Sequence, residues 1–323
     1  MLKKIRTIFL RVVVSALSLG VVVYMARGEF TEGFSRLADL KWTPILIALA
    51  INFASLLVVT CRIQIVLAMQ KIHIRFARLY YLWTISLFFN LFLPSAVGGD
   101  IAKAYYIAKD SGKKLASVTS VLIDRFFGLM ATISIGFAAY FFSKHHIDDP
   151  KIGQLLCWVA GAVLIIMLLL VSRRFLTPGK YIAFKLAPKR FKERLDRFFE
   201  AVDLFRAHRA VFFGVYLYSL AAQAMFIVLV YFLARSISVD VPLALFFLFL
   251  PLITVISMLP SVGGLGVREA AIVYLFRTQV PTDQAVAISL MFDLFLYGLG
   301  FACGILYAIR GGASIRELEE IET

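Results

Sequence analysis

Long apolar runs alternate with short polar segments along almost the whole chain. A helix needs about 20 mainly apolar residues to cross the hydrocarbon core of a bilayer. Runs of that order predict membrane-spanning helices at about 8–26, 44–61 (or to 69 if tilted), 117–142, 153–172, 210–234 and 284–309. Two further apolar runs, 79–93 and 243–259, are too short to cross comfortably, and each ends in a segment rich in proline and glycine.

These two Pro/Gly-rich segments are copies of one pattern, and we call them the first tip segment (Leu93–Asp100) and the second tip segment (Leu259–Gly266). In both, Leu-Pro-Ser precedes a pair of glycines. A more polar helical stretch and a long apolar run that contains an aspartate follow each copy. Non-helical backbone is tolerated at membrane depth only where protein or a water-filled cavity surrounds it. Two interrupted segments in matching places of two halves are a sequence indicator of a transporter binding site.

Composition excludes an ordinary soluble domain. Hydrophobic residues make up 61% of the 323 residues, only 17% are charged, and the mean hydropathy is +0.87. Soluble domains are close to half apolar and a quarter charged, so the chain is expected to be a polytopic membrane protein. The net charge of +14 fits cytoplasmic loops at an anionic lipid surface. No basic patch lies on a recognisable nucleic-acid-binding fold, so no nucleic-acid partner is predicted.

The longest polar stretch, 173–209, is also the most basic, with eleven Lys and Arg residues against four Asp and Glu residues. Its apolar residues recur at helical spacing, at Phe191, Leu195, Phe198, Val202 and Phe205. A helix with one apolar face and basic residues elsewhere is typical of a helix lying on the membrane surface. We therefore interpret 173–209 as an interfacial helix on the cytoplasmic leaflet, or alternatively as a surface for a partner helix.

Charge also decides the predicted topology. If both short runs crossed the membrane and the N-terminus lay inside, 173–209 would lie outside, against the positive-inside rule. A re-entrant hairpin at 79–112, with both ends inside, removes this conflict. The basic segments then all lie in the cytoplasm, namely 1–11, 62–78, 101–116 and 173–209. The nearly neutral loops then all lie outside, namely 27–42, 143–152 and 235–242.

The predicted fold is therefore an all-α polytopic membrane protein with six crossing helices plus two re-entrant helical hairpins in an inverted repeat. Residues 1–323 are expected to form a single membrane domain, with repeat halves at about 43–142 and 210–309 and a basic amphipathic connector at 173–209. Inverted repeats are the architecture of many alternating-access transporters. Both termini are expected in the cytoplasm, and the protein in the plasma (inner) membrane.

Each tip segment is expected near the bilayer midplane, at the end of its hairpin. Glycine allows close backbone approach, and the helix that follows offers free N–H groups and the positive end of its dipole, which bind phosphate. The alternative is a tight, packed turn between short helices. The predicted substrate-path residues in the tips are Pro94, Ser95, Gly98, Gly99, Pro260, Ser261, Gly263, Gly264 and Gly266.

Charged residues complete the predicted substrate path, because ionisable groups inside a membrane are costly and are functional candidates by default. They are Asp100, Lys103, Asp124, Arg125, Arg268, Glu269 and Asp293. The bases would balance the charge of a phosphate, and Asp124 or Asp293 would carry a coupling proton; with a cationic cargo the four acids would be the contacts instead. In the structural alternative, Asp100 caps a helix, Lys103 extends its amine to the interface, and the two aspartates form ion pairs with Arg268 or Arg62.

No motif in the sequence indicates catalysis or a bound cofactor. The chain has no nucleophile elbow, P-loop or dinucleotide fingerprint, so neither enzymatic activity nor a cofactor is predicted. The four histidines do not have metal-ligand spacing on one helix, although His145 and His146 share a loop with Asp148 and Asp149. No metal is predicted there, and the three cysteines are interpreted as small buried hydrophobic residues.

The motifs Asn90–Ser95, Gly98–Asp100, Asp124–Arg125 and Leu259–Glu269 resemble those of a known family. It is the flippase-like transmembrane family of lysylphosphatidylglycerol synthases, and the resemblance covers about residues 8–310. In two-part members, a soluble domain aminoacylates phosphatidylglycerol and the membrane part moves the product to the outer leaflet. This chain stops about a dozen residues after its last predicted span, so it is expected to resemble a stand-alone member without the synthase domain. Stand-alone relatives are linked with glycolipid, polyprenyl-lipid or hopanoid pathways.

The sequence and the resemblance together lead to one principal hypothesis. The protein would translocate a phosphate-bearing lipid, such as an aminoacylated phospholipid or a polyprenyl lipid or glycolipid, between leaflets. The alternative is a non-transporting membrane subunit that holds a synthase or glycosyltransferase, with 173–209 as the docking surface. A third hypothesis, an enzyme in its own right, is disfavoured by the missing catalytic motifs. The expected partners are thus the lipid, the anionic membrane surface and a synthase or glycosyltransferase.

Overall fold

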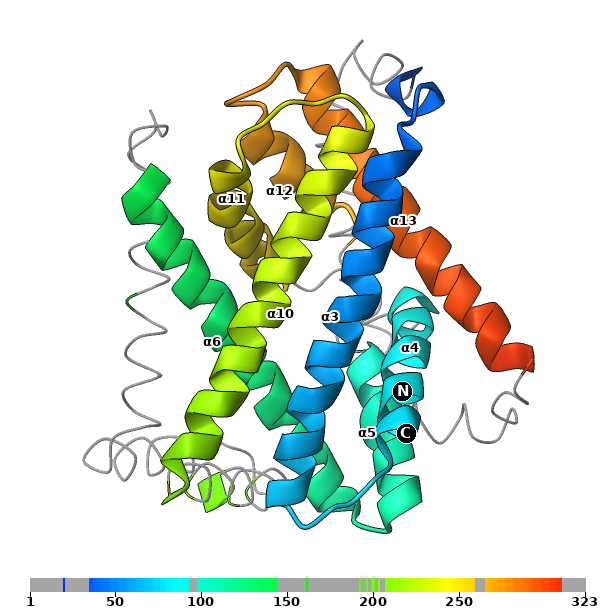
Figure 1. The fold of residues 1–323 in the computed structure, drawn as a ribbon, viewed down its shortest axis with the longest axis vertical. Helices are drawn as coiled ribbons and strands as arrows, with labels where there is room; N and C mark the ends of the chain where they lie inside the picture. The colour runs from blue at the N-terminus through cyan, green and yellow to red at the C-terminus, as the bar shows by residue number, and fades with distance from the viewer. Residues whose placement is uncertain are drawn as a thin grey trace. The chain divides into compact units, whose positions relative to one another are not determined.

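A computed structural model describes residues 35–92, 98–143, 207–258 and 265–309, and also positions 20, 161, 192, 196, 199, 200 and 203. Every regular element in this part of the chain is helical (Figure 1), which confirms the predicted all-α class. The elements are η1 (Arg36–Ala38), α3 (Trp42–Met69), α4 (Phe76–Phe92), α5 (Gly98–Ser111), α6 (Lys114–Ser143), α10 (Arg209–Ser236), α11 (Leu243–Ile256), α12 (Val267–Phe276) and α13 (Thr282–Ile309). The predicted spans 8–26 and 153–172, and most of 173–209, lie outside the described residues.

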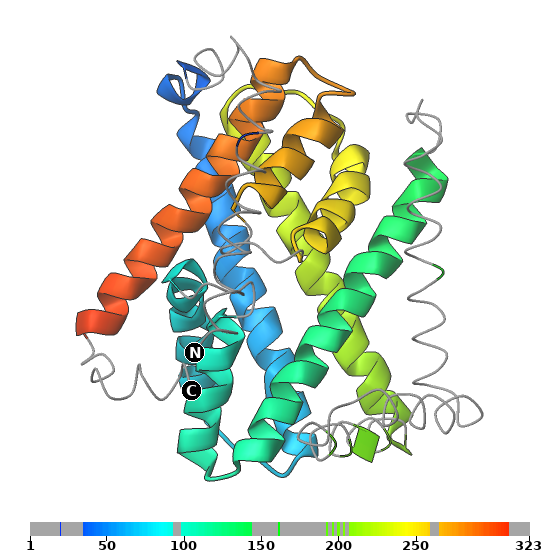
Figure 2. The same ribbon diagram turned by 180° about the vertical axis from the view of Figure 1, so that it is seen from behind.

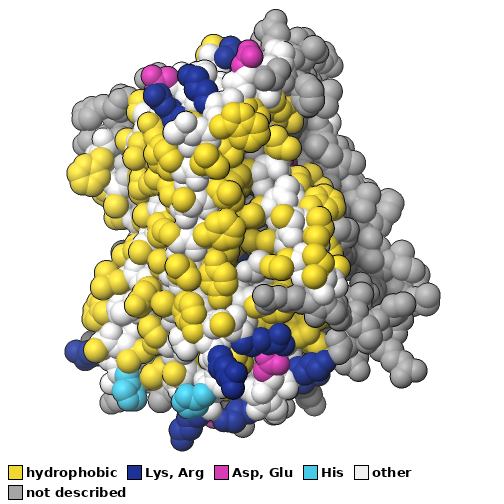
Figure 3. Space-filling model, turned by 45° about the vertical axis from the view of Figure 1, so that its right-hand side comes forward, with side chains coloured by type: hydrophobic (Ala, Val, Ile, Leu, Met, Phe, Trp, Pro, Cys, Tyr) yellow, Lys and Arg dark blue, Asp and Glu magenta, His cyan; other side chains and the backbone are white. Residues whose placement is uncertain are grey.

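Four of the described helices, α3, α6, α10 and α13, are long and apolar enough to cross a membrane. Many of their large apolar side chains are exposed, among them Leu46, Phe141, Leu217 and Ile305. On the face drawn in Figure 3, apolar side chains cover most of the described surface and the charged ones gather at its margins. Extended apolar surface of this kind is retained in contact with lipid rather than water, so the chain is an integral membrane protein. The count of six crossing helices stays a prediction.

Two pairs of short helices separate the long ones. Helices α4 and α5 have 17 and 14 residues, and α11 and α12 have 14 and 10. At about 1.5 Å per residue, even α4 is about 25 Å long, less than the roughly 30 Å of a hydrocarbon core. The order long, short, short, long thus occurs both in Trp42–Ser143 and in Arg209–Ile309.

Helices α4 and α5 form an antiparallel hairpin. At its open end, Arg78 near the start of α4 donates from Nε and Nη2 to Asp110 near the end of α5, at 2.8 and 3.2 Å. At its closed end, the Gly99 N–H donates to the Asn90 Oδ1 at 2.7 Å. A Cβ atom on Gly99 would lie 2.3 Å from the Ser86 carbonyl oxygen, so only glycine permits this approach of α5 to α4.

Helices α11 and α12 form a second antiparallel hairpin. The ring of Phe276, the last residue of α12, lies 4.9 Å from that of Phe246 and 5.3 Å from that of Phe249, both in the first half of α11. The start of α12 follows Gly266, whose φ of 81° lies in the left-handed region that favours glycine. The two short helix pairs therefore share one arrangement, in which the chain turns back between two helices too short to span a bilayer.

The contacts divide the chain into two compact units. Unit 1 holds the described residues of Met1–Ala54, Trp83–Ala102 and Met225–Thr323, and unit 2 those of Ser55–Leu82 and Lys103–Ala224. Helices α3, α4, α5 and α10 contribute residues to both units. Each unit therefore draws on both of the long-short-short-long sets of helices.

Unit 2 is held together by contacts among α3, α6 and α10. The Tyr216 hydroxyl on α10 donates to the Ser134 Oγ on α6 at 2.7 Å. One turn earlier on α10, the ring of Phe212 lies 5.1 Å from that of Phe127 on α6, edge to face. Aromatic pairs of this geometry add to the energy of apolar burial.

In unit 1, α13 packs against α12 and contacts three other helices. The ring of Phe292 lies 6.0 Å from that of Phe226 on α10, and η1 is joined to α13 by the Arg36–Asp283 ion pair at 2.7 Å. Closer to its end, Tyr307 contacts Phe88 and Phe89 of α4, at ring distances of 6.1 and 5.5 Å. Helix α13 is thus in contact with both short hairpins.

Helices α3 and α10 run antiparallel. The Lys41 N–H, just before α3, donates to the carbonyl of Ser236, the last residue of α10, at 2.8 Å in unit 1. In unit 2, Arg62 of α3 donates to Ser219 of α10 at 3.2 Å. In both ribbon views (Figures 1 and 2), the start of α3 lies beside the end of α10, as the bond between Lys41 and Ser236 requires. In the chain, the first hairpin follows the end of α3 in unit 2, and the second follows the end of α10 in unit 1.

Candidate functional site

The candidate residues of the predicted substrate path are divided between the two units. Gly98, Gly99, Asp100, Gly266, Arg268, Glu269 and Asp293 belong to unit 1, and Lys103, Asp124 and Arg125 to unit 2. The remaining candidates, Pro94, Ser95, Pro260, Ser261, Gly263 and Gly264, lie outside the described residues.

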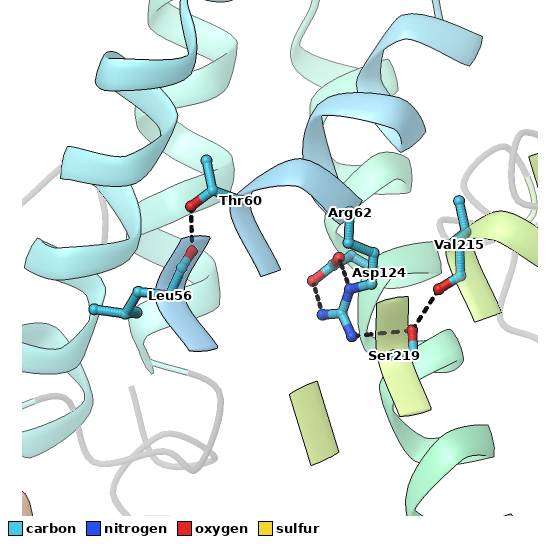
Figure 4. Close-up of polar contacts among 6 residues, drawn as sticks. All are labelled: Leu56, Thr60, Arg62, Asp124, Val215 and Ser219. Atoms are coloured by element: carbon cyan, nitrogen blue, oxygen red, sulfur yellow. Dashed lines mark hydrogen bonds and ion pairs between the residues drawn. The ribbon is translucent and has the colours of Figure 1, made fainter. Parts of the chain in front are cut away.

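In unit 2, Asp124 of α6 forms a buried ion pair with Arg62 of α3 (Figure 4). Arg62 donates from Nε to Oδ1 at 2.7 Å and from Nη2 to Oδ2 at 2.8 Å. Its third nitrogen, Nη1, donates to the Ser219 Oγ on α10 at 3.2 Å, and Ser219 donates in turn to the Val215 carbonyl at 2.9 Å. The side chains of Arg62 and Asp124 are 6% and 2% exposed.

This arrangement is balanced in charge and in hydrogen bonds. One guanidinium faces one carboxylate, and both carboxylate oxygens of Asp124 accept a bond from Arg62. A two-pronged pair of this kind combines strength with a fixed geometry. The predicted structural alternative for Asp124, an ion pair with Arg62, is therefore what the structure contains.

The other candidates on α5 and α6 differ in burial. Lys103 is 1% exposed, so its amine lies within unit 2 and does not extend to the surface. Arg125, next to Asp124, is only half-buried, and Asp100 is half-buried in the first turn of α5. An acid in the first turn of a helix interacts favourably with the helix dipole.

In unit 1, Arg268, Glu269 and Asp293 form what we call the charge cluster. The Nη2 atom of Arg268 donates both to the Glu269 Oε1 at 2.9 Å and to the Asp293 Oδ1 at 2.5 Å. Both carboxylates therefore meet at one nitrogen of one guanidinium. The guanidinium also lies over the ring of Phe292, with its carbon 5.1 Å from the ring centre. The side chains of all three charged residues are at most 16% exposed.

Local sequence explains how the charge cluster forms. Helix α12 begins just after Gly266, so Arg268 and Glu269 occupy its buried first turn. Asp293 lies opposite them on α13, with Ser289 one turn before it and Tyr297 one turn after it. Residues four apart share a helix face, and Tyr297 interacts electrostatically with all three charged groups.

The charge cluster, unlike the pair in unit 2, is not balanced. It combines two carboxylates with one guanidinium. Two of its buried polar atoms, the Arg268 Nε and the Glu269 Oε2, have no hydrogen-bond partner among the described residues, and neither has the Oγ of Ser289, one turn before Asp293 on α13. Buried polar atoms are nearly always hydrogen-bonded. The structural alternative paired each aspartate with Arg268 or Arg62; in the structure Asp293 pairs with Arg268, and Glu269 adds an acid to this pair.

Sequence analysis did not identify Ser219, Ser289 or Tyr297 as parts of these sites. The spacing of four between Ser289, Asp293 and Tyr297 was a usable signal for a polar face on the last helix. No local signal marks Ser219, because it meets Arg62 only through the packing of α10 against α3 in unit 2. Asn90, a polar residue in an apolar run, accepts an interhelical hydrogen bond from the Gly99 N–H.

At the open end of the first hairpin, Arg78 and Asp110 form an ion pair outside the long apolar helices. The hydrogen bond to Asp110 raises the pKa of Arg78 above its ordinary value, although partial burial opposes this, and the Asp110 charge adds to it. The Arg78 guanidinium also lies 5.7 Å from the centre of the Tyr81 ring. Arg78 therefore stays charged and joins the two ends of the hairpin at any physiological pH.

The sequence matches the family described as the lysylphosphatidylglycerol synthase TM region over residues 8–304. The chain belongs to this family. It is also 26% identical over 219 residues to the UPF0104 membrane protein MJ1078 of Methanocaldococcus jannaschii, a match that covers 65% of this chain and 88% of that protein. The predicted family is thereby confirmed, and membership connects the chain with membrane lipids. Both hairpins and the charge cluster lie inside the matched range.

Proposed function

We propose that this protein translocates a phosphate-bearing lipid between the leaflets of the bilayer. The observation that carries the proposal is the buried charge cluster, in which Arg268 and Glu269 at the start of the short helix α12 meet Asp293 of α13. Ionisable groups at membrane depth are costly and are retained for substrate or ion pathways. The headgroup would follow the tip segments while the acyl or polyprenyl chains stay in lipid.

The two hairpins support this proposal. Both are too short to span a bilayer and both turn back on themselves, so we propose that they are re-entrant. The described residues of both tip segments belong to unit 1, where α13 contacts the second hairpin through Asp293 and the first through Gly304 and Tyr307. One helix that contacts both hairpins provides a mechanical link between them.

The antiparallel course of α3 and α10 supports an inverted repeat of the two hairpins, with halves at about 43–142 and 210–309. We propose six crossing helices in total, both termini in the cytoplasm, and the plasma membrane as the site of action. The connector 173–209 would lie on the anionic lipid surface of the cytoplasmic leaflet. Two-sided access of this kind is what alternating-access transport requires.

Within the proposed path, the residues have different roles. The helix N-termini that follow the tip segments would receive the phosphate, and Lys103 and Arg125 would add positive charge. Arg268 is already held by two carboxylates, so a phosphate would reach it only if one acid were neutralised. Aminoacyl transfer is not part of the proposed role.

The test is a reconstitution experiment. The purified protein is placed in liposomes that contain fluorescent phospholipids or polyprenyl phosphates, and accessibility of each lipid at the outer leaflet is followed over time. Wild type is compared with Asp293→Asn, Arg268→Ala and Asp124→Asn, and with Asp283→Asn as a matched control on α13 outside the charge cluster. We expect movement of one lipid class that Asp293→Asn and Arg268→Ala abolish and Asp283→Asn retains.

The opposite result has a definite meaning. If no lipid class moves while the protein is folded, the scaffold hypothesis replaces translocation. The search would then turn to a synthase or glycosyltransferase that binds 173–209. Substitutions in 189–206 would weaken that binding, and substitutions in the charge cluster would leave it unchanged.

A further inference from the structure

The Arg62–Asp124 pair and the charge cluster differ in net charge, as their hydrogen bonds show. In unit 2, Arg62 and Asp124 cancel, and each carboxylate oxygen accepts one bond. In unit 1, Arg268 is shared between Glu269 and Asp293, so one negative charge is left over when both acids are ionised. Although the sequence motifs align Asp124 with Asp293, only Asp293 belongs to a site with surplus acid.

A surplus charge in such a place has to be neutralised. Taking an unpaired carboxylate out of water costs several kcal/mol or more, and buried acids in apolar surroundings bind protons instead. Two carboxylates that share one site do not both ionise freely, because each opposes the charge of the other. The Glu269 Oε2 atom is buried and has no partner among the described residues, so it has the capacity to hold a proton.

The described neighbours of the charge cluster add no further charge to it. On α13, Ser289 and Tyr297 are neutral groups, and Phe292 and the Phe226 ring of α10 are apolar. Helix α11, which packs against α12, has no titratable side chain in Leu243–Ile256. Within the described part of unit 1, Arg268 is thus the base that faces these two acids.

We propose that Glu269 and Asp293 together hold one exchangeable proton. The proton would sit on one of the two carboxyl groups and be donated toward the other, so that the protonated pair and Arg268 together are neutral. The titration belongs to the pair rather than to either residue. Its role as the coupling proton of lipid movement rests on the proposed function, whereas the binding of the proton does not.

Loss of this proton would leave one uncompensated negative charge in the charge cluster, close in the chain to Gly266. The surplus carboxylate would then compete for the Arg268 guanidinium and draw it further into the cluster. Protonation would release Arg268 from one of its two acids and make it available to an anionic headgroup. Binding of the headgroup phosphate would thus be coupled to binding of the proton, and both would occupy the site together.

The test is infrared spectroscopy of the full chain in lipid nanodiscs, recorded as a pH titration in the absence of any transported lipid. Wild type should show the C=O stretching band of one buried protonated carboxylic acid near neutral pH, and this band should disappear on alkalinisation. Asp293→Asn and Glu269→Gln should each lose the band, because one acid and Arg268 then balance. Arg268→Gln should keep it to higher pH, since two acids then face no base.

The matched control is Asp283→Asn, which removes a carboxylate from α13 that Arg36 already balances at 2.7 Å. It should keep the band and its titration. The proposal is overturned if the band survives both single neutralisations, or if folded wild type has no titrating band and is instead stabilised by Na⁺. Failure of lipid transport with the band intact would overturn the proposed function and leave the proton site standing.

Discussion

Arg62 and Asp124, which are 62 positions apart, face each other through two parallel hydrogen bonds of 2.7 and 2.8 Å. Both side chains are almost fully buried, and a third bond from Arg62 reaches Ser219. A single contact thus connects α3, α6 and α10 within unit 2. Asp124 is one of the residues predicted from the sequence for the substrate path, and in this pair it holds helices together.

The first prediction concerns this pair. Asp124→Asn should destabilise the protein by about 3–5 kcal/mol, because removal of one partner leaves a buried charge uncompensated. Thermal unfolding in detergent, followed by the loss of folded protein, measures the effect. The double variant Arg62→Gln/Asp124→Asn should lose less than the sum of the two single variants, since neither charge is then left alone.

The Arg78–Asp110 pair provides the matched control, because its side chains are 41% and 25% exposed. Exposed pairs contribute roughly 0–1 kcal/mol, so Arg78→Gln should lower stability much less than Asp124→Asn. Equal losses for the two variants would show that Arg62 and Asp124 are not the central contact of unit 2.

The second prediction concerns the closed end of the first hairpin. In Gly99→Ala, the new Cβ would lie 2.3 Å from the Ser86 carbonyl oxygen and 2.8 Å from the Asn90 side chain, so α5 must move away from α4. Overpacking of this kind costs about 1–3 kcal/mol, and we expect lipid movement to fall as well. Gly214→Ala is the control, because its Cβ would have no described neighbour within 4 Å. It should be neutral or slightly stabilising, since alanine favours helix.

The third prediction concerns the contact of α13 with the first hairpin. A Cβ on Gly304 would lie 2.3 Å from the Phe88 ring, so Gly304→Ala should force that ring to move and weaken the contact. In a Phe88→Leu background the same substitution should cost clearly less, because the ring is gone. A double-mutant cycle of unfolding free energies measures this coupling. Additive effects would mean that Gly304 and Phe88 do not constrain each other.

The fourth prediction tests the orientation of the hairpins. Single cysteines are introduced into a variant without native cysteine at the loops that flank each hairpin, as His73→Cys, Lys113→Cys, Asp240→Cys and Gln279→Cys. All four positions are exposed. With a membrane-impermeant maleimide, positions 73 and 113 should label from one side and positions 240 and 279 from the other. Labelling of 73 and 113 from opposite sides would mean that α4 and α5 cross the membrane.

The apolar pattern of the sequence was enough to locate the long helices that the structure describes. The span predicted at 210–234 is Arg209–Ser236 in the structure, and the one predicted at 284–309 is Thr282–Ile309. The reason is that helix length depends on apolar periodicity and on proline and glycine, and these are local properties of the chain. The family was also evident from the sequence, because its motifs are short and contiguous.

Only the tertiary structure decided which charges meet. In the sequence, Asp124 and Asp293 follow the same kind of motif and look equivalent, and either could pair with Arg62 or Arg268. In the structure, Asp124 receives a whole guanidinium, whereas Asp293 shares one with Glu269. The energy of a buried charge depends on the number of opposite charges within a few ångströms. Helix packing sets those distances across long sequence separations, and no local pattern records them.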